Sequence, residues 1–181
     1  MNRLVVITVG KTHSGKTTFA NALEKEMLNT VVIDQDNHAE FLHKHYEKLL
    51  PKHGHNTIKY ALTKTIVDFA INYTDCNIIL SNSNRSREGR SKLLEPFHDR
   101  EFTSVIVNFD ISEQVLQERV TTSQRNTSIL RTVSSFEDVL IRQRNEEVLS
   151  PTEEEADHLF VIRNTSEVPS VIREITEIAK R

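Results

Sequence analysis

The sequence predicts an α/β protein, a three-layer sandwich in which helices cover both faces of a five-stranded parallel sheet. Five short apolar runs alternate with segments of helical periodicity, and strands buried on both faces of a sheet have this apolar character. A glycine-bounded loop joins the first apolar run to a helical pattern. A chain of 181 residues is long enough for one domain with a substantial core. We therefore expect a single domain over residues 1–181.

The expected strands are rich in Val and Ile, which favour extended backbone. They span residues 4–9, 30–34, 77–80, 103–109 and 158–162. Cys76, the only cysteine, precedes the third of these strands, and we expect it to be a small buried side chain.

Seven helices are expected between and after the strands, where apolar residues recur at spacings of three and four. The first follows residue 17, and the others span about 37–50, 56–73, 86–98, 112–120, 136–149 and 166–180. Pro51 ends the second helix and Pro151 follows the sixth, because proline cannot continue a helix. Ser112 is expected to cap the fifth helix. The polar stretch between the fifth and sixth helices has little periodicity, and we expect a loop there.

Residues 10–17 read G-x-x-x-x-G-K-T, between an expected strand and an expected helix. This is the phosphate-binding (Walker A) loop, whose backbone N–H groups surround the phosphates of a nucleoside triphosphate at a helix N-terminus. Lys16 is expected to bridge the β- and γ-phosphates, and the Thr17 hydroxyl to hold Mg²⁺. The expected nucleotide-binding set is Gly10, Lys11, Thr12, His13, Ser14, Gly15, Lys16, Thr17 and Thr18.

Two acids follow the second expected strand, at the edge of the sheet where the carboxyl ends of the strands meet. Asp36 is in a position to accept the proton of an attacking hydroxyl, and Asp34 to act as a second acid near Mg²⁺. Alternatively, Asp36 caps a helix that begins near Asn37.

These residues, with residues 78–84 and Arg90, resemble the P-loop kinases grouped with polynucleotide kinase, gluconate kinase and zeta toxins. The resemblance covers about residues 3–165. It implies a fold like that of nucleoside monophosphate kinases, a mobile lid at about 121–135 and phosphoryl transfer from ATP to a hydroxyl. Such kinases usually carry an acid at the end of the third strand, where this chain has Ser81, so magnesium is expected to depend on Thr17 and Asp34.

The resemblance also gives roles to several arginines. Arg125 is the first candidate to stabilise the transition state from the lid, and Arg119 is the next candidate for phosphate contact, because a guanidinium binds phosphate through two hydrogen bonds. Arg131 follows Arg125 at the same spacing as Arg125 follows Arg119. The alternative interpretation is that all three are solvated surface residues. Arg85 and Arg90 follow the third strand, a region that contacts the acceptor in similar kinases.

Composition limits the other function classes. The net charge of −3 gives no electrostatic argument for general nucleic-acid binding, and no apolar run approaches membrane-span length. One cysteine is typical of a reducing compartment, so a cytoplasmic location is expected. The eight histidines include His43, His45, His53 and His55, whose spacing does not favour a shared metal ion.

The leading hypothesis is an ATP- and Mg²⁺-dependent phosphotransferase, a kinase acting on a hydroxyl of a small-molecule acceptor, as a monomer or homodimer. Lys16, Asp36 and Arg125 would form its catalytic set. One alternative is a nucleotide-binding switch or ATPase without such an acceptor, which Ser81 favours. Another is a kinase of 5′-hydroxyl nucleic-acid ends. Ala39 argues against this alternative, because polynucleotide kinases have an arginine at that position.

Overall fold

The computed structural model describes residues 3–130 and 133–180, so Arg131 lies outside the described residues. The strands are β1 (Arg3–Gly10), β2 (Thr30–Asp34), β3 (Asn77–Ser81), β4 (Phe102–Phe109) and β5 (His158–Ile162). The helices are α1 (Lys16–Glu26), α2 (Gln35–Tyr46), α3 (Thr57–Tyr73), α4 (Arg87–His98), α5 (Glu113–Thr121), α6 (Phe136–Asn145) and α7 (Val168–Ala179). Short 3-10 turns lie at Glu47–Leu49, Glu153–Glu155 and Thr165–Glu167.

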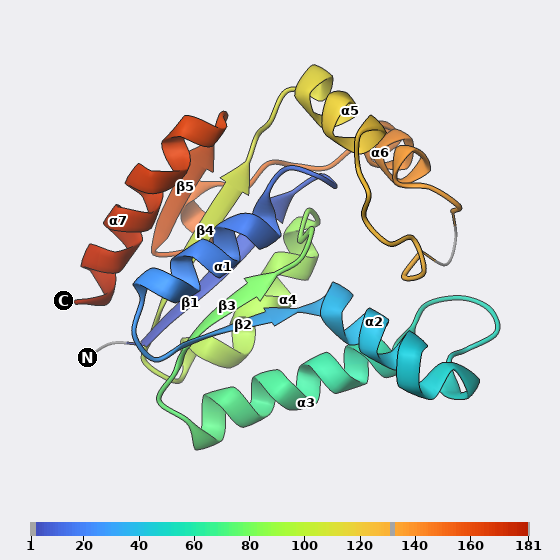
Figure 1. Cartoon of the computed structure of the whole chain (residues 1–181). Helices are drawn as coiled ribbons and strands as arrows, with labels where there is room; N and C mark the ends of the chain where they lie inside the picture. The colour runs from blue at the N-terminus through green and yellow to red at the C-terminus, as the bar shows by residue number, and fades with distance from the viewer. Residues whose placement is uncertain (1–2, 131–132, 181) are drawn as a thin grey trace.

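The five strands form one parallel sheet in the order β2-β3-β1-β4-β5 (Figure 1). The register places Val6 of β1 between Ile79 of β3 and Val105 of β4. This confirms the expected five-stranded parallel sheet with helices flanking it.

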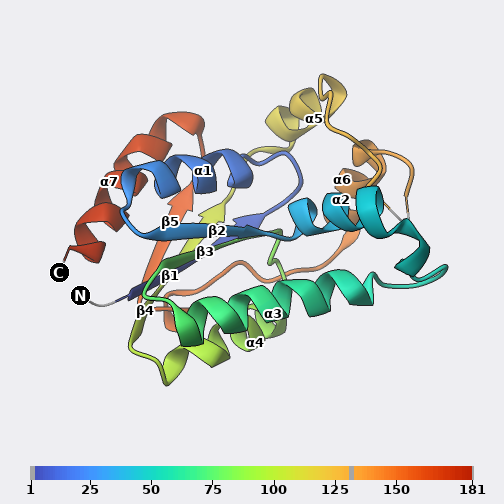
Figure 2. The ribbon, with the colours of Figure 1, turned by 60° about the horizontal axis from the view of Figure 1, so that its bottom comes forward.

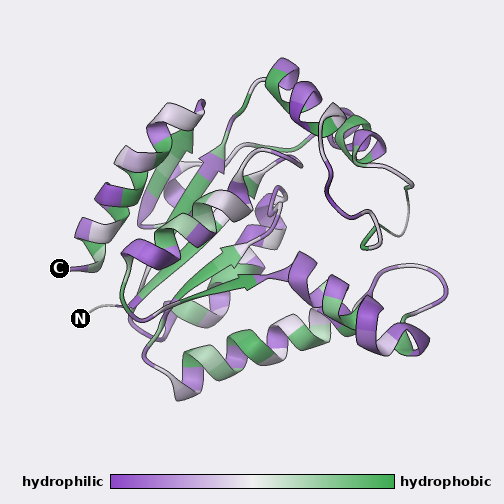
Figure 3. Cartoon of the chain, in the orientation of Figure 1, coloured by the Kyte–Doolittle hydropathy of each residue, from purple (hydrophilic) through white to green (hydrophobic). Residues whose placement is uncertain are grey.

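Helices pack on both faces of the sheet, with α1 and α7 on one side and α3 and α4 on the other (Figure 2). Alternate residues of β1 enter the two resulting cores: Leu4 and Val6 pack in the first, Val5 and Ile7 in the second. All four side chains are fully buried. The middle residues of the strands are accordingly mostly apolar, whereas the helices carry both polar and apolar residues (Figure 3).

Four local expectations differ from the structure. The second helix begins at Gln35, two residues early, and the sixth ends at Asn145 because Glu146 has extended backbone. Ser112 occupies the N-cap position of α5 but makes no side-chain hydrogen bond there. Cys76 is half-buried rather than buried, and its thiol donates to Asn29 Oδ1 at 3.2 Å.

Since all the strands are parallel, their carboxyl ends lie at one edge of the sheet, and in such folds ligands bind there. Asp34, Ser81, Phe109 and Ile162 end β2, β3, β4 and β5, and all four line the same cavity. Gly10 ends β1 and opens the phosphate loop at this edge. Within the described residues, no helix has both the length and the apolar character needed to cross a bilayer.

Candidate active site

A cavity of about 820 Å³ opens at the carboxyl edge of the sheet. Its walls come from the phosphate loop, the ends of four strands, α2, residues 125–130, α6 and the start of α7. Residues 12–18 all line it, whereas Gly10 and Lys11 of the expected nucleotide-binding set do not.

The backbone of the phosphate loop adopts the left-handed region of φ at three positions. Gly10 has a φ of 150°, and a Cβ there would lie 2.9 Å from Ser14 Oγ and 3.0 Å from Phe109. Gly15 has a φ of 104° at the N-cap of α1, and His13 has a φ of 58°. Both glycines are thus required by conformation, since other residues rarely adopt such φ values.

The loop delivers the N-terminus of α1 to the cavity. The first-turn N–H groups of Lys16, Thr17 and Thr18 have no carbonyl partner within the helix, because a helix leaves its first N–H donors unpaired. Together with the helix dipole, such donors form an anion site. This part of the cavity is therefore chemically suited to phosphate.

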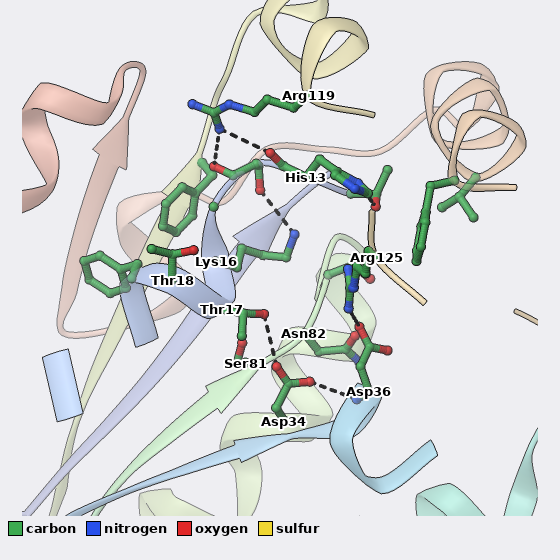
Figure 4. A pocket seen from close by; sticks show the side chains of 18 of the residues that line it. His13, Lys16, Thr17, Thr18, Asp34, Asp36, Ser81, Asn82, Arg119 and Arg125 are labelled. Carbon is green, nitrogen blue, oxygen red and sulfur yellow. Dashed lines mark hydrogen bonds and ion pairs between the residues drawn. The ribbon is translucent and has the colours of Figure 1, made fainter. Parts of the chain in front are cut away.

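The Lys16 ammonium lies inside the loop, where Nζ donates to the carbonyl of Lys11 at 2.6 Å and to Ser14 Oγ at 3.2 Å (Figure 4). Burial lowers its pKa from 10.5 to about 8. The carboxylates of Asp36 and Asp34 oppose that shift, and Arg125 adds to it. A cation held this way gains strongly from a phosphate partner.

Helix α6 contacts the phosphate loop through a hydrogen bond that the sequence pattern did not predict. The buried side chain of Gln143 accepts a hydrogen bond from the Thr12 N–H at 2.7 Å. Nearby, Lys11 pairs with Glu113 of α5, which also pairs with Arg144 of α6 at 2.5 Å. The Lys11 side chain is therefore engaged in an ion pair outside the cavity.

Thr17, Asp34 and Asp36 form a connected chain of polar groups. The Thr17 hydroxyl donates to Asp34 Oδ2 at 3.1 Å, and Asp34 Oδ1 accepts from the Asp36 N–H at 2.8 Å. Asp34 is thus the N-cap of α2, the role that was the alternative for Asp36. The Asp36 carboxylate lies in the first turn of the helix and lines the cavity.

Ser81 lies directly beside Asp34, because the two residues are register partners on neighbouring strands. Ser81 is buried and also lines the cavity. The carboxylate beside the end of β3 is thus that of Asp34, on the neighbouring strand β2.

Arg125 reaches the cavity from the segment between α5 and α6. Its guanidinium pairs with Asp36 at 2.5 Å and lies 5.0 Å from the centre of the Phe136 ring (Figure 4). Ser123, in the same segment, contacts the ring nitrogen Nε2 of His13 at 2.7 Å. Through these contacts the segment touches both the phosphate loop and the acid after β2.

Arg119 approaches the loop on the opposite side of Lys16 from Asp36 (Figure 4). Its Nη1 donates to the carbonyls of His13 and Ser14 at 3.2 and 3.3 Å, and its Nη2 to Thr165 Oγ1 at 3.0 Å. Arg119 also lines the cavity, and its contact with a nucleotide phosphate stays a prediction.

Arg85 and Arg90, expected to contact substrate, do not line the cavity. Arg90 is completely buried, pairs with both carboxylate oxygens of Glu155 at 2.7 and 2.9 Å, and donates to the Arg85 carbonyl. Arg85 pairs with Glu146 at 2.7 Å and donates to the Gln143 carbonyl at 2.7 Å. These contacts join α4 and α6 to neighbouring segments, and the acceptor contact expected of both arginines stays a prediction.

The cavity also contains residues that sequence patterns did not single out. Glu40 lies one turn beyond Asp36 on α2, and Ile129 and Leu130 follow Arg125. Only the helical spacing of Asp36 and Glu40 was a signal in the sequence. Among the described residues, no group of three or more His, Cys, Asp or Glu side chains is arranged to hold a metal ion.

Known structures share this fold at low sequence identity. A protein of Chloroflexus aurantiacus that carries a provisional kinase description is 15% identical, with a TM-score of 0.72 over 98% of each chain. Kti12 of Chaetomium thermophilum, solved with ADP-AlF3, is 14% identical, with a TM-score of 0.66 over 96% of this chain and 97% of that one. The APS kinase CysC of Mycobacterium tuberculosis, solved with AMPPNP and APS, is 15% identical, with a TM-score of 0.60 over 99% of each chain.

No curated protein sequence matches the chain. The family model described as the AAA domain matches residues 5–140, which includes the phosphate loop, both acids and the segment bearing Arg125. That match covers well over half of the 181 residues. The chain therefore belongs to the AAA domain family and has the fold of the P-loop kinases.

Proposed function

We propose that this protein is an ATP-dependent phosphotransferase that transfers the γ-phosphoryl group to a hydroxyl of a small-molecule acceptor. The observation that carries the proposal is the presence, in one cavity, of a phosphate loop, a carboxylate suited to a base and an arginine paired with that carboxylate. A protein that only binds nucleotide has no evident need for the second and third of these.

The donor side of the reaction is assigned to residues 12–18. The first-turn amides of α1 would bind the β- and γ-phosphates, and the Lys16 ammonium would move from the Lys11 carbonyl to phosphate oxygens. Arg119 and Thr18, on the other side of Lys16 from Asp36, would lie towards the nucleoside.

The residues present fit a magnesium ion. The Thr17 hydroxyl and the Asp34 carboxylate lie 3.1 Å apart, and oxygen ligands of this kind are those that Mg²⁺ prefers. When bound, the ion would neutralise charge on the phosphate oxygens. Asp34 would supply the carboxylate that Ser81 lacks, because the two residues are register partners on neighbouring strands.

The acceptor side is assigned to Asp36. Its carboxylate would take the proton of the acceptor hydroxyl as that oxygen bonds to the γ-phosphorus and the bond to the β–γ bridging oxygen breaks, leaving ADP. Arg125 would then contact the transferring phosphoryl group, where negative charge is spread over the equatorial oxygens.

The ion pair between Arg125 and Asp36 would make ATP binding precede proton transfer to Asp36. Phosphate oxygens compete with the carboxylate for the guanidinium, and release of Arg125 frees Asp36 to accept a proton. Residues 121–135 would in this way act as a lid that responds to ATP. The boundary of the lid and a cytoplasmic location remain predictions from the sequence.

A second candidate is a nucleotide-dependent switch. The specific observation in its favour is Ser81 at the end of β3, where related kinases usually carry an acid. The same assay separates the two functions, because a switch binds ATP but gives no acceptor-dependent ADP.

The test is ADP production with Mg²⁺ and a panel of nucleosides, sugars, aminoglycosides and 5′-hydroxyl oligonucleotides, with Lys16→Ala as the blank. ADP that depends on a small-molecule acceptor and on Lys16 is the expected result. ATP binding without acceptor-dependent turnover would favour the switch, and turnover confined to oligonucleotides would favour a nucleic-acid kinase.

A further inference from the structure

The side chain of His13, at a position that the phosphate-loop pattern leaves variable, is held in place by its neighbours. His13 has a φ of 58°, in the left-handed region where histidine, asparagine and aspartate are enriched among residues other than glycine. Its Nδ1 lies 2.9 Å from Thr12 Oγ1, and its main-chain carbonyl accepts from Arg119 Nη1 at 3.2 Å (Figure 4). Both the ring and the backbone of His13 therefore have fixed partners.

The His13 ring also contacts the segment that carries Arg125. Its Nε2 lies 2.7 Å from Ser123 Oγ, and the same hydroxyl oxygen accepts a hydrogen bond from the Arg125 N–H at 3.2 Å. Two consecutive hydrogen bonds thus connect a side chain of the phosphate loop to the backbone of Arg125. Since His13 and Ser123 are 110 residues apart in the chain, this connection is a tertiary contact between two separate parts of the site.

Phe136, at the start of α6, gives His13 and Arg125 a shared packing surface. The His13 ring packs edge-on against the Phe136 ring, with 5.0 Å between the ring centres, and the Arg125 guanidinium lies 5.0 Å from the centre of the same ring. Phe136 is itself buried in the first hydrophobic core. A fixed aromatic side chain therefore supports both residues where the phosphate loop approaches Asp36.

A neutral His13 ring satisfies these hydrogen bonds. Burial lowers the pKa of His13 from 6.5, and the nearby cations Arg125, Lys16 and Arg119 lower it further. A neutral imidazole has one N–H donor and one acceptor nitrogen. In the tautomer with the proton on Nδ1, the ring donates to Thr12 Oγ1 and accepts from the Ser123 hydroxyl, whose oxygen remains free to accept from the Arg125 N–H.

We propose that His13 is a positioning residue that acts through Ser123: it holds the backbone of Arg125 beside the phosphate loop, within reach of both Asp36 and the phosphates. The proposal rests on the phosphotransferase function proposed above. The exchange of Arg125 from Asp36 to phosphate oxygens is then a movement of its side chain, while its backbone stays at the loop. The His13 ring itself takes no part in the transfer of the phosphoryl group or of a proton.

Amide hydrogen exchange on the free protein tests the contact between His13 and Ser123 without any assay of activity. His13→Asn keeps a residue type suited to the left-handed backbone but does not extend as far as Nε2, and Ser123→Ala removes the hydroxyl. In both variants, residues 123–130 are expected to exchange about 10-fold faster than in the wild type, as for one lost hydrogen bond. Ser123→Thr keeps the hydroxyl and is expected to match the wild type. The control Thr122→Ala, whose hydroxyl donates to a carbonyl of α5, is expected to match it as well.

Kinetics tests whether His13 acts through Arg125. The assay is ADP production with ATP, Mg²⁺ and the compound of the panel above that the wild type phosphorylates. His13→Asn and Ser123→Ala are each expected to lower kcat about 10-fold with the KM of ATP unchanged, and Ser123→Thr to retain the wild-type kcat. In an Arg125→Ala background, His13→Asn is expected to lower kcat no further, because the guanidinium that it positions has been removed.

Three outcomes would overturn different parts of the proposal. Wild-type exchange of residues 123–130 in both His13→Asn and Ser123→Ala would overturn the contact, whatever the activity. Equal losses of kcat from His13→Asn with and without Arg125 would overturn the positioning of Arg125 while leaving a phosphotransferase. Faster exchange as expected, but no acceptor-dependent ADP from the wild type, would overturn the phosphotransferase and any effect of His13 on turnover, and would leave the contact confirmed.

Discussion

Lys16 shows how a single side chain is prepared for an anionic ligand. Its ammonium is buried among loop carbonyl and hydroxyl oxygens, and burial lowers its pKa to about 8. A phosphate group close to the ammonium would favour the charged form and raise that pKa again. ATP binding is therefore coupled to proton uptake wherever the free protein has lost this proton.

This coupling predicts the pH dependence of ATP affinity. Below pH 8 Lys16 is charged before binding, whereas above pH 8 each further pH unit weakens ATP binding by up to about 10-fold. Calorimetric titration from pH 7 to 9, in buffers of different ionisation enthalpy, measures both the affinity and the proton uptake. Lys16→Met is the control and is expected to lose this pH dependence, and a wild-type affinity that is flat across the range would contradict the assignment.

Asp36 is expected to affect turnover far more than nucleotide binding. Asp36→Asn keeps the shape of the side chain but removes the base, which lowers kcat by about 100-fold or more. The same change releases Arg125, so the Kd of ATP is expected to stay equal or fall. Steady-state kinetics together with ATP titration checks both; full turnover in the variant would remove Asp36 from the mechanism.

Arg125 is expected to affect turnover far more than stability. Its ion pair with Asp36 is partly solvent-exposed, with 37% and 40% of the two side chains accessible. Such pairs add little to stability, about 1 kcal/mol at most. Arg125→Ala is therefore expected to unfold near the wild-type temperature, yet to lose about 1,000-fold in kcat, as for other arginines that stabilise a phosphoryl transition state. Thermal unfolding and steady-state kinetics on the same preparation measure the unfolding temperature and kcat. A large fall in the unfolding temperature of Arg125→Ala would contradict this expectation.

At the scale of elements, the position of the phosphate loop depends on α6. The hydrogen bond from the Thr12 N–H to Gln143 joins residues 131 positions apart in the chain. Gln143→Leu leaves that buried N–H without its partner, at an expected cost of about 1–3 kcal/mol. We expect weaker ATP binding as well, with Gln114→Leu on the exposed surface of α5 as the control. Denaturant unfolding and ATP titration test both expectations, and an unchanged ATP affinity would show that Gln143 does not position the loop.

The pairing of Arg90 with Glu155 links α4 to the turn that precedes β5. Arg90 is inaccessible and only 8% of the Glu155 side chain is exposed. Removal of one member of a buried pair costs about 3–5 kcal/mol when the other charge is left unpaired. Glu155 keeps a weaker, partly exposed partner in Arg87 at 4.0 Å, so we expect the lower end of this range. Arg90→Met is expected to lose this much stability in urea unfolding, and Arg90→Met with Glu155→Gln to regain part of it. If Arg90→Met were stable but poor in acceptor binding, the substrate role expected from the sequence would be restored.

The sequence predicted the elements well because each depends on local spacing. The bounds of β2 and β5 are those expected, and glycines at positions 10 and 15 marked the phosphate loop. The contacts of Gln143 and Arg90 were not predicted because their partners are 131 and 65 residues away, which no local pattern contains. The N-cap of α2 was missed because the helix begins directly at the end of β2, without an intervening loop.

At the scale of the whole molecule, the parallel sheet explains why the site forms where it does. All five strands run in one direction, so the phosphate loop, Asp34 and Ser81 meet at one edge although they are distant in sequence. The two cores on either side of the sheet fix that edge, while residues 125–130 contribute from outside the sheet. In the proposed reaction, the loop at the edge of the sheet would bind the donor phosphates, and the acceptor would contact the more exposed residues 125–130.

In the proposed reaction, the γ-phosphoryl group goes to an organic hydroxyl rather than to water. The most direct measurement follows the label from γ-³²P-ATP in the presence of Mg²⁺ and a metabolite extract, with wild type, Lys16→Ala and Asp36→Asn in parallel. We predict an organic phosphate ester that forms with the wild type, is absent with Lys16→Ala and is strongly reduced with Asp36→Asn. Label found only in ATP and inorganic phosphate with the wild type would show that this protein is not a phosphotransferase acting on an organic hydroxyl.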